Sequence, residues 1–175
     1  MSDQVQIEIL DAKEAQSSVA ALADVLTDCV AGGASVSFML PLPREHALQF
    51  WQGVAEGVAR KERVLLVARG TGDEIIGTVQ LIIAMPDNQT HRADVAKMLV
   101  HRSARRRGVA HALMAAVEKA ARAEGKTVLV LDTVTGGDAE RLYERAGWQK
   151  VGVIPNYALM PDGDFCGTTI FHKQI

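Results

Sequence analysis

Apolar residues recur along this chain with two different spacings, which alternate from segment to segment. Segments with every second residue apolar, or with all residues apolar, predict β-strands, and apolar residues three or four positions apart predict amphipathic helices. The predicted strands are Val5 to Leu10, Arg63 to Arg69, Glu74 to Met85, Arg92 to Val100, Thr127 to Asp132, Trp148 to Tyr157 and Phe165 to His172. The predicted helices are Ala12 to Ala31, Arg44 to Lys61, Val109 to Glu124 and Asp138 to Ala146.

The order of these elements indicates one α/β domain that spans residues 1 to 175. The helix from Val109 to Glu124 lies between two predicted strands, and such a β-α-β unit makes its two strands parallel. The other strands follow one another through short turns, such as Gly70 to Asp73, and should be antiparallel. We therefore predict a mixed central sheet of about seven strands, mostly antiparallel and partly parallel, with helices on both faces.

Composition and charge exclude several classes of protein. With 19 Lys and Arg against 21 Asp and Glu, the net charge is −2, which argues against nonspecific binding to nucleic acids or membrane surfaces. The chain has no run of 18 apolar residues and no secretion signal at its start, so we expect a soluble cytoplasmic protein. Cys29 and Cys166 lie far apart and form no metal-binding pattern, so we expect free thiols and no metal.

One short segment is basic, contains a glycine and opens a predicted helix. It consists of Arg105, Arg106, Arg107, Gly108, Val109 and Ala110, with His111 directly after it. A helix N-terminus offers free backbone N–H groups and a positive dipole end, and a glycine lets a ligand approach the backbone closely. These features predict a site for a phosphate-bearing ligand. The alternative is that the arginines form only a solvated basic surface.

The basic segment fits the pattern Arg/Gln-x-x-Gly-x-Gly/Ala, and a second pattern, Leu-Tyr-x-x-x-Gly-Trp, follows at residues 142 to 148. With the strand before them, the two patterns resemble the GNAT superfamily of N-acetyltransferases over roughly residues 60 to 160. The P-loop and dinucleotide-binding patterns are absent. The first pattern alone would be weak evidence for a family. The resemblance is specific because both patterns occur, in this order, in the same chain.

The resemblance implies a GNAT fold and acetyl-CoA as co-substrate. Its diphosphate would bind around Gly108, with His111 near the coenzyme. Backbone groups of Met98, Leu99 and Val100 would hold the pantetheine arm, with one amide near the thioester carbonyl. A backbone donor at that place stabilises the negative charge that develops on the oxygen during acyl transfer.

Three residues are candidates for catalysis. Asp94 stands eleven residues before Arg105, where members of the superfamily place an acidic general base; its alternative role is an ion pair with Arg92 or Lys97. Asp132, at the end of a predicted strand, is a second base or an anchor for the substrate ammonium group, or else an acceptor within the following turn.

Tyr143 occupies the position of the superfamily's general acid, which protonates the coenzyme A sulfur; its alternative role is helix packing. The family often has Asn seven residues before this tyrosine, and here that residue is Gly136.

The acceptor is expected to be the amine of a small, amino-acid-like metabolite, antibiotic or toxin. Several segments resemble tabtoxin-resistance-type acetyltransferases, which acetylate a β-lactam amino acid and confer antibiotic resistance. The first two predicted helices and the last hairpin would line the acceptor site with Ser35, Phe38, Trp51, Asn156 and Tyr157.

Two other classes of protein remain open from the sequence. A non-catalytic acyl-CoA-binding module would keep the basic turn and would not need Asp94 or Tyr143. A nucleic-acid-binding domain would use Arg102 to Arg107, but the negative net charge and few aromatic residues argue against it. We expect no nucleic-acid or membrane partner, and a monomer or homodimer.

Overall fold

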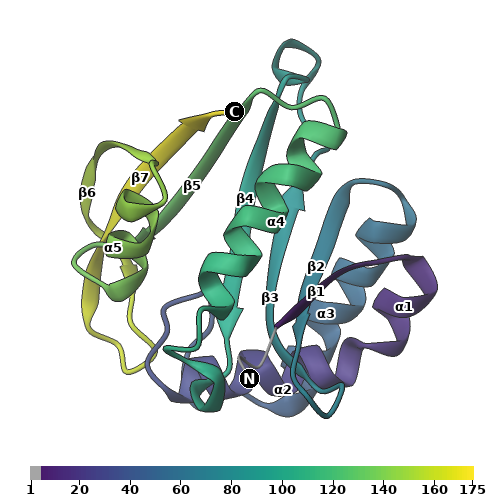
Figure 1. Ribbon diagram of the computed structural model, residues 1–175. Helices are drawn as coiled ribbons and strands as arrows, with labels where there is room; N and C mark the ends of the chain where they lie inside the picture. Colours follow the sequence, from purple (N-terminus) through teal and green to yellow (C-terminus); the bar gives the residue numbers. More distant parts are fainter. Residues whose placement is uncertain (1–4) are drawn as a thin grey trace.

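The sheet within residues 5–175, the part described by a computed structural model, has seven strands in the order β1-β2-β3-β4-β5-β7-β6 (Figure 1). The strands are β1 (Gln6–Leu10), β2 (Arg63–Arg69), β3 (Ile75–Ile82), β4 (Arg92–Val100), β5 (Val128–Val134), β6 (Gln149–Leu159) and β7 (Phe165–Gln174). Neighbouring strands are antiparallel except for β4 and β5. The predicted mixed sheet is therefore confirmed.

Five α-helices of residues 5–175 cover both faces of this sheet: α1 (Ala12–Ser17), α2 (Val19–Ala31), α3 (Arg44–Ala59), α4 (Val109–Ala123) and α5 (Asp138–Arg145). One hydrophobic cluster packs α1, α2 and α3 against one face, and a second packs α4 and α5 against the other. In Figure 1, α4 crosses in front of the centre of the sheet. Two short 3₁₀ turns, η1 (Asp87–Gln89) and η2 (Arg102–Ala104), flank β4.

The single helix predicted over Ala12 to Ala31 is wrong, because the chain breaks at Ser18. This residue ends α1 and begins α2, with ψ of −3°. The hydroxyl of the preceding Ser17 donates to the Glu14 carbonyl at 3.0 Å. Serine side chains that bond to nearby backbone groups compete with helical hydrogen bonds, which favours a break at a pair of serines. The apolar spacing on both sides hides the break.

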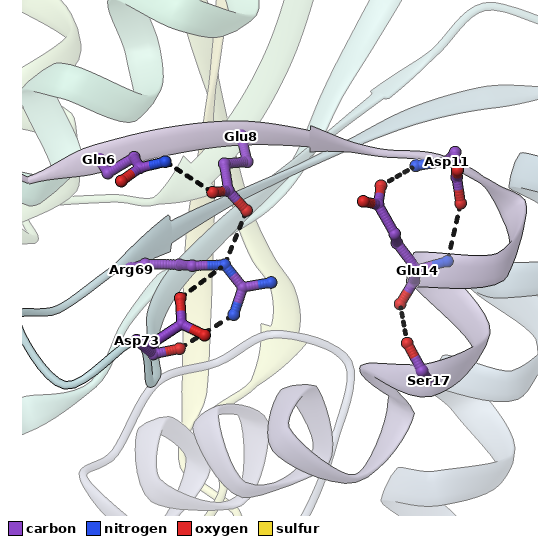
Figure 2. Close-up of polar contacts among 7 residues, drawn as sticks. All are labelled: Gln6, Glu8, Asp11, Glu14, Ser17, Arg69 and Asp73. Atoms are coloured by element: carbon purple, nitrogen blue, oxygen red, sulfur yellow. Dashed lines mark hydrogen bonds and ion pairs between the residues drawn. The ribbon is translucent and has the colours of Figure 1, made fainter.

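Strand β1 and helix α1 are fixed by local polar contacts, which Figure 2 shows. The Arg69 Nε of β2 donates to Glu8 of β1 at 2.7 Å and lies 3.6 Å from Asp73. At the start of α1, the Asp11 carboxylate accepts from the Glu14 N–H, and the Glu14 carboxylate accepts from the Asp11 N–H, both at 2.8 Å. This reciprocal capping satisfies two amides that would otherwise lack partners.

Strands β4 and β5 run side by side only at one end. Arg92–Asp94 of β4 pair with Val128–Val130 of β5, and no pairing follows. Figure 1 shows the two strands separating beyond that point. We call the unpaired segments, residues 95–100 of β4 and 131–134 of β5, the splay.

An extra residue in β4 changes the direction of its side chains within the splay. Thr78 and Gln80 of β3 face Leu99 and Ala96 of β4, so three steps along β4 match two along β3. The irregularity includes Lys97, which has a positive φ of 51°. Such a bulge reverses the alternation of faces. Before it, Ala93 and Val95 lie in the α4 cluster; after it, Leu99 lies in the α1–α3 cluster.

The loop between α2 and α3 reaches across the molecule to the last hairpin. The Ser35 hydroxyl donates to the Leu159 carbonyl at 2.7 Å, and the Leu40 N–H donates to the Pro161 carbonyl at 3.0 Å. These two contacts join the half of the sheet that carries β4 to the half that carries β6 and β7. Among residues 5–175, no helix has the length and apolar character needed to cross a membrane.

Candidate active site

The start of α4 is open to a ligand. Gly108 is the N-cap residue with φ of 79°, and no side chain caps this helix. The first intrahelical bond runs from the Ala112 N–H to the Gly108 carbonyl at 3.0 Å, so the N–H groups of Val109, Ala110 and His111 have no partner within the helix. A Cβ on Gly108 would meet no atom within 4 Å. The predicted anion site therefore has free donors and clear space.

One of the exposed arginines around the turn is held by a carboxylate of α2. Arg102 donates to the Asp28 carboxylate of α2 through its backbone N–H at 2.8 Å and its Nε at 2.9 Å. Although burial alone would raise it, these bonds hold the pKa of Asp28 below its usual value. Arg105, Arg106 and Arg107 are exposed. Arg105 forms a hydrogen bond with the Cys29 thiol, and all three stand directly before the open helix start at Gly108.

The backbone of β4 offers hydrogen-bonding groups to the splay. The His101 N–H donates to the Ile76 carbonyl of β3 at 2.9 Å. Since successive residues of a strand direct their N–H groups to opposite edges, Val100 and Met98 direct theirs toward the splay and Leu99 toward β3. The resemblance implies that backbone groups of all three residues hold the pantetheine arm. In the structure, only Met98 and Val100 direct their N–H groups toward the splay. The Cys29 thiol, whose pKa burial raises, lies 3.4 Å from the Val100 carbonyl oxygen.

Asp94 and Asp132 lie on the same face of the sheet. Their strand neighbours Ala93 and Leu131 belong to the α4 cluster, so alternation directs both carboxylates to the opposite face. Asp94 lies in the last paired position, and Arg92 donates to it through Nη1. The ion pair foreseen as an alternative for Asp94 is therefore present.

Asp132 lies two residues beyond the last β4–β5 pair and is exposed. It accepts a hydrogen bond from the Thr168 hydroxyl at 2.8 Å. The N-cap of α5 is Gly137, without a capping side chain, so Asp132 does not cap that helix. The Asp132 carboxylate therefore lies in the splay, where it is hydrogen-bonded by Thr168 of β7 and not by the following turn.

Tyr143 of α5 is 5% exposed and packs with its ring centroid 6.1 Å from Trp148 and 5.9 Å from Phe171. Burial raises the pKa of its hydroxyl, and the negative charge of Asp132 raises it further. The hydroxyl is therefore protonated at neutral pH. No described residue forms a hydrogen bond with it. The packing that the sequence offered as an alternative role for Tyr143 is therefore present, and its hydroxyl keeps its proton.

The turn before α5 is fixed by a buried carboxylate. Glu140 accepts from the Gly136 N–H, from Lys150 Nζ at 3.0 Å and from the Thr169 hydroxyl at 3.1 Å. The bond from Gly136 and the ion pair with Lys150 lower the pKa of Glu140. Gly136 has φ of 80°, a conformation that glycine and asparagine adopt most readily. Gly136, which stands where the family often has asparagine, therefore forms part of this turn and donates its N–H to Glu140.

Lys97 is a residue of this site whose position the sequence did not reveal. Its Nζ donates to the Ser37 hydroxyl at 3.1 Å and lies 5.8 Å from the ring centroid of Phe50. Burial lowers the pKa of the ammonium group, and the charge of Asp132 opposes that shift. The sequence suggests this lysine only as a partner of Asp94. The continuous apolar run after Lys97, where alternation stops, was the available signal of a bulge.

The predicted acceptor residues occupy different environments. Phe38 stacks edge-on with Phe50 at 5.2 Å, whereas Asn156 and Tyr157 are exposed on β6. Ser35 is used in the contact with Leu159. Trp51 is 1% exposed and packs in the α1–α3 cluster, so it presents no surface to an acceptor. Helical spacing identifies an inward face but does not distinguish a core position from a site position.

Two surface hollows lie outside the splay. One is lined by residues of α2 and α3 around Gln52, and the other by Ser18, Arg69 and His101 among others. Within residues 5–175, no group of three or more His, Cys, Asp or Glu side chains is arranged to hold a metal ion.

Comparisons with known proteins identify the family. A model of the acetyltransferase (GNAT) family matches residues 37–148. An uncharacterized N-acetyltransferase from the hisH-hisA intergenic region of Azospirillum brasilense is 37% identical over 113 residues, which are 63% of this chain and 65% of that relative. This chain thus aligns with less than two thirds of the relative's length.

Solved structures share the fold. An N-acetyltransferase from Staphylococcus aureus superposes with a TM-score of 0.78 at 16% identity over 98% of both chains. The yncA protein of Salmonella typhimurium, solved with its cofactor acetyl-CoA, superposes with a TM-score of 0.78 at 17% identity over 98% of this chain and 94% of that one. At such identities the likeness concerns the fold alone. The family match covers more than half of the sequence, and the chain belongs to the acetyltransferase (GNAT) family.

Proposed function

We propose that this protein transfers the acetyl group of acetyl-CoA to the amine of a small, amino-acid-like molecule. The single observation that carries the proposal is that two sets of unpaired backbone N–H donors follow each other closely along the chain. The uncapped amides at Gly108 come eight residues after Val100, where the unpaired edge of β4 ends. A ligand with a diphosphate at one end and an amide-bearing arm can use both.

The residues fit such a ligand on structural grounds. The helix start has no capping side chain and has space above Gly108, and exposed arginines stand beside it. Val100 and Met98 can pair with the arm as a neighbouring strand would. When bound, acetyl-CoA supplies an activated acyl carbon.

The carboxylates on the α3 face of the sheet hold the amine and take its proton. A primary amine is mostly protonated at neutral pH, with a pKa of about 10.4, and must lose a proton to attack. Asp132 lies in the splay and takes this proton before the nitrogen attacks the acyl carbon. The second proton leaves the nitrogen as the adduct collapses to the amide and the free thiol. Asp94, paired with Arg92 at the closed end, orients the amine.

Tyr143 serves the departing sulfur. Its hydroxyl stays protonated, so it donates a hydrogen bond to the sulfur while the carbon–sulfur bond breaks. The amide of Val100 or Met98 donates to the carbonyl oxygen, on which negative charge develops.

Two measurements test the proposed function. Calorimetric titration with acetyl-CoA should show binding to one site per chain, and Gly108→Val should weaken it. Release of free thiol should then rise when amino acids and β-lactam amino acids are added as acceptors. Binding without thiol release from any amine would favour a non-catalytic acyl-CoA-binding module, and absence of binding by folded protein would refute the proposal.

A further inference from the structure

The splay contains two opposite charges that form no ion pair with each other. Lys97 has no carboxylate within 4.0 Å among residues 5–175, yet the charge of Asp132 acts on its ammonium group. Here Lys97 is bonded to Ser37 instead.

Three contacts from separate elements fix the position of the Lys97 ammonium group. The bulge in β4 directs the side chain, Ser37 of the α2–α3 loop accepts one N–H, and the Phe50 ring of α3 lies 5.8 Å away. An ammonium group has three donors, and Ser37 is the single hydrogen-bond acceptor that residues 5–175 provide for it. A partly buried cation therefore retains donors for a ligand.

The neighbouring groups restrict what such a ligand can be. Ser37 and Phe50 carry no charge, and Asp132 carries the opposite one. An anionic group of the acceptor would satisfy the free donors of Lys97, while Asp132 takes the amine. The arrangement is complementary to a molecule that bears a carboxylate and an amine on the same carbon atom.

We propose that Lys97 binds the carboxylate of an α-amino-acid acceptor and thereby selects acceptors in which a carboxylate adjoins the reacting amine. This inference rests on the proposed function and narrows its substrate class. Lys97 contacts the substrate without taking part in proton transfer. Its loss should therefore act on KM more than on kcat.

The test compares acceptors that differ only in the carboxylate. Steady-state kcat/KM is measured for the best amino acids of a panel and for their carboxamides, with wild type, Lys97→Met and Lys97→Arg. Wild type should prefer the acid at least about 10-fold. In Lys97→Met, kcat/KM for the acid should fall about 10- to 100-fold, as expected for a charge-assisted hydrogen bond, and that for the carboxamide less than about threefold. Lys97→Arg should keep part of the preference.

Lys119→Met is the matched control, because it removes the same charge from an exposed position of α4. It should leave the preference for the acid unchanged. The pH profile gives a second readout: the preference should decline as pH rises and Lys97 loses its charge. Because burial lowers its pKa, this decline should begin below the pH at which an exposed lysine ionises.

Several outcomes would overturn the inference. Equal losses for acid and carboxamide in Lys97→Met would make Lys97 a support for the α2–α3 loop, and a wild-type preference for carboxamides would exclude carboxylate binding. Both results would leave acetyl transfer intact. If no amine releases thiol, the proposed function and this inference fail together, and acetyl-CoA calorimetry shows whether coenzyme binding survives.

Discussion

The two ends of the β4–β5 pair differ in how far the protein satisfies its own polar groups. At the closed end the backbone ladder is complete and Arg92 holds Asp94. In the splay the β4 edge has no partner strand, and Lys97 forms no ion pair with Asp132. On the neighbouring helix α5, no described residue bonds the Tyr143 hydroxyl. Because unpaired polar groups cost free energy when shielded from water, their concentration at one end indicates a ligand site.

The largest expected effect is a difference in kcat between variants of the two carboxylates, Asp132 and Asp94. Asp132→Asn should lower kcat about 10²- to 10⁴-fold at neutral pH, the range for a lost general base, whereas Asp94→Asn should lower it less than about 10-fold. Steady-state kinetics with one amine acceptor would measure both. The reverse order would make Asp94 the base, as its sequence position suggests, and would place the proton transfer at the closed end.

A second prediction concerns the turn beyond the splay. Gly108→Val should weaken acetyl-CoA binding about 10- to 100-fold, because a side chain enters the space that the diphosphate needs. Gly125→Val is a matched control, since Gly125 also has a positive φ, at 69°, and nothing within 4 Å of its Cβ position. Each variant should lose about 1–2 kcal/mol of stability through backbone strain. Equal acetyl-CoA affinities of Gly108→Val and Gly125→Val in calorimetry would show that the diphosphate does not bind at Gly108.

The third prediction concerns the phenol. Tyr143→Phe should reduce kcat about 10-fold and leave acetyl-CoA affinity within about twofold, because its hydroxyl acts on the sulfur only as it leaves. Pre-steady-state and steady-state rates with calorimetry would separate the two effects. An unchanged kcat would limit Tyr143 to packing against Trp148 and Phe171.

The smallest expected effect is on stability at alkaline pH. The folded pKa of Tyr143 is raised, so the unfolded chain releases this proton first, at about pH 10. The free energy of unfolding should therefore be unaffected by this group below about pH 10 and should fall above it. Denaturant titrations should show a shallower fall for Tyr143→Phe, and Tyr157→Phe, which removes an exposed hydroxyl, should keep the wild-type slope.

Periodicity identified the strands, the parallel pair and the mixed sheet because the burial of alternating faces is encoded residue by residue. The break at Ser18 and the bulge at Lys97 were missed, since each is a local event that apolar spacing continues across. The turn motif identified Gly108 but not the engagement of Arg102 by Asp28, which comes from α2. Contacts between distant elements, such as that of Lys97 with Ser37, are invisible in a single sequence.

The tether between the α2–α3 loop and the last hairpin has a consequence for the size of molecule that can be accommodated. It connects Ser35 and Leu40 with Leu159 and Pro161, on the far side of the strands that diverge. Forcing those strands wider would first break two hydrogen bonds, at about 0.5–1.5 kcal/mol each. For an acceptor bound in the splay, as we propose, this penalty would disfavour molecules that need wider strands, through a crosslink between segments 124 residues apart.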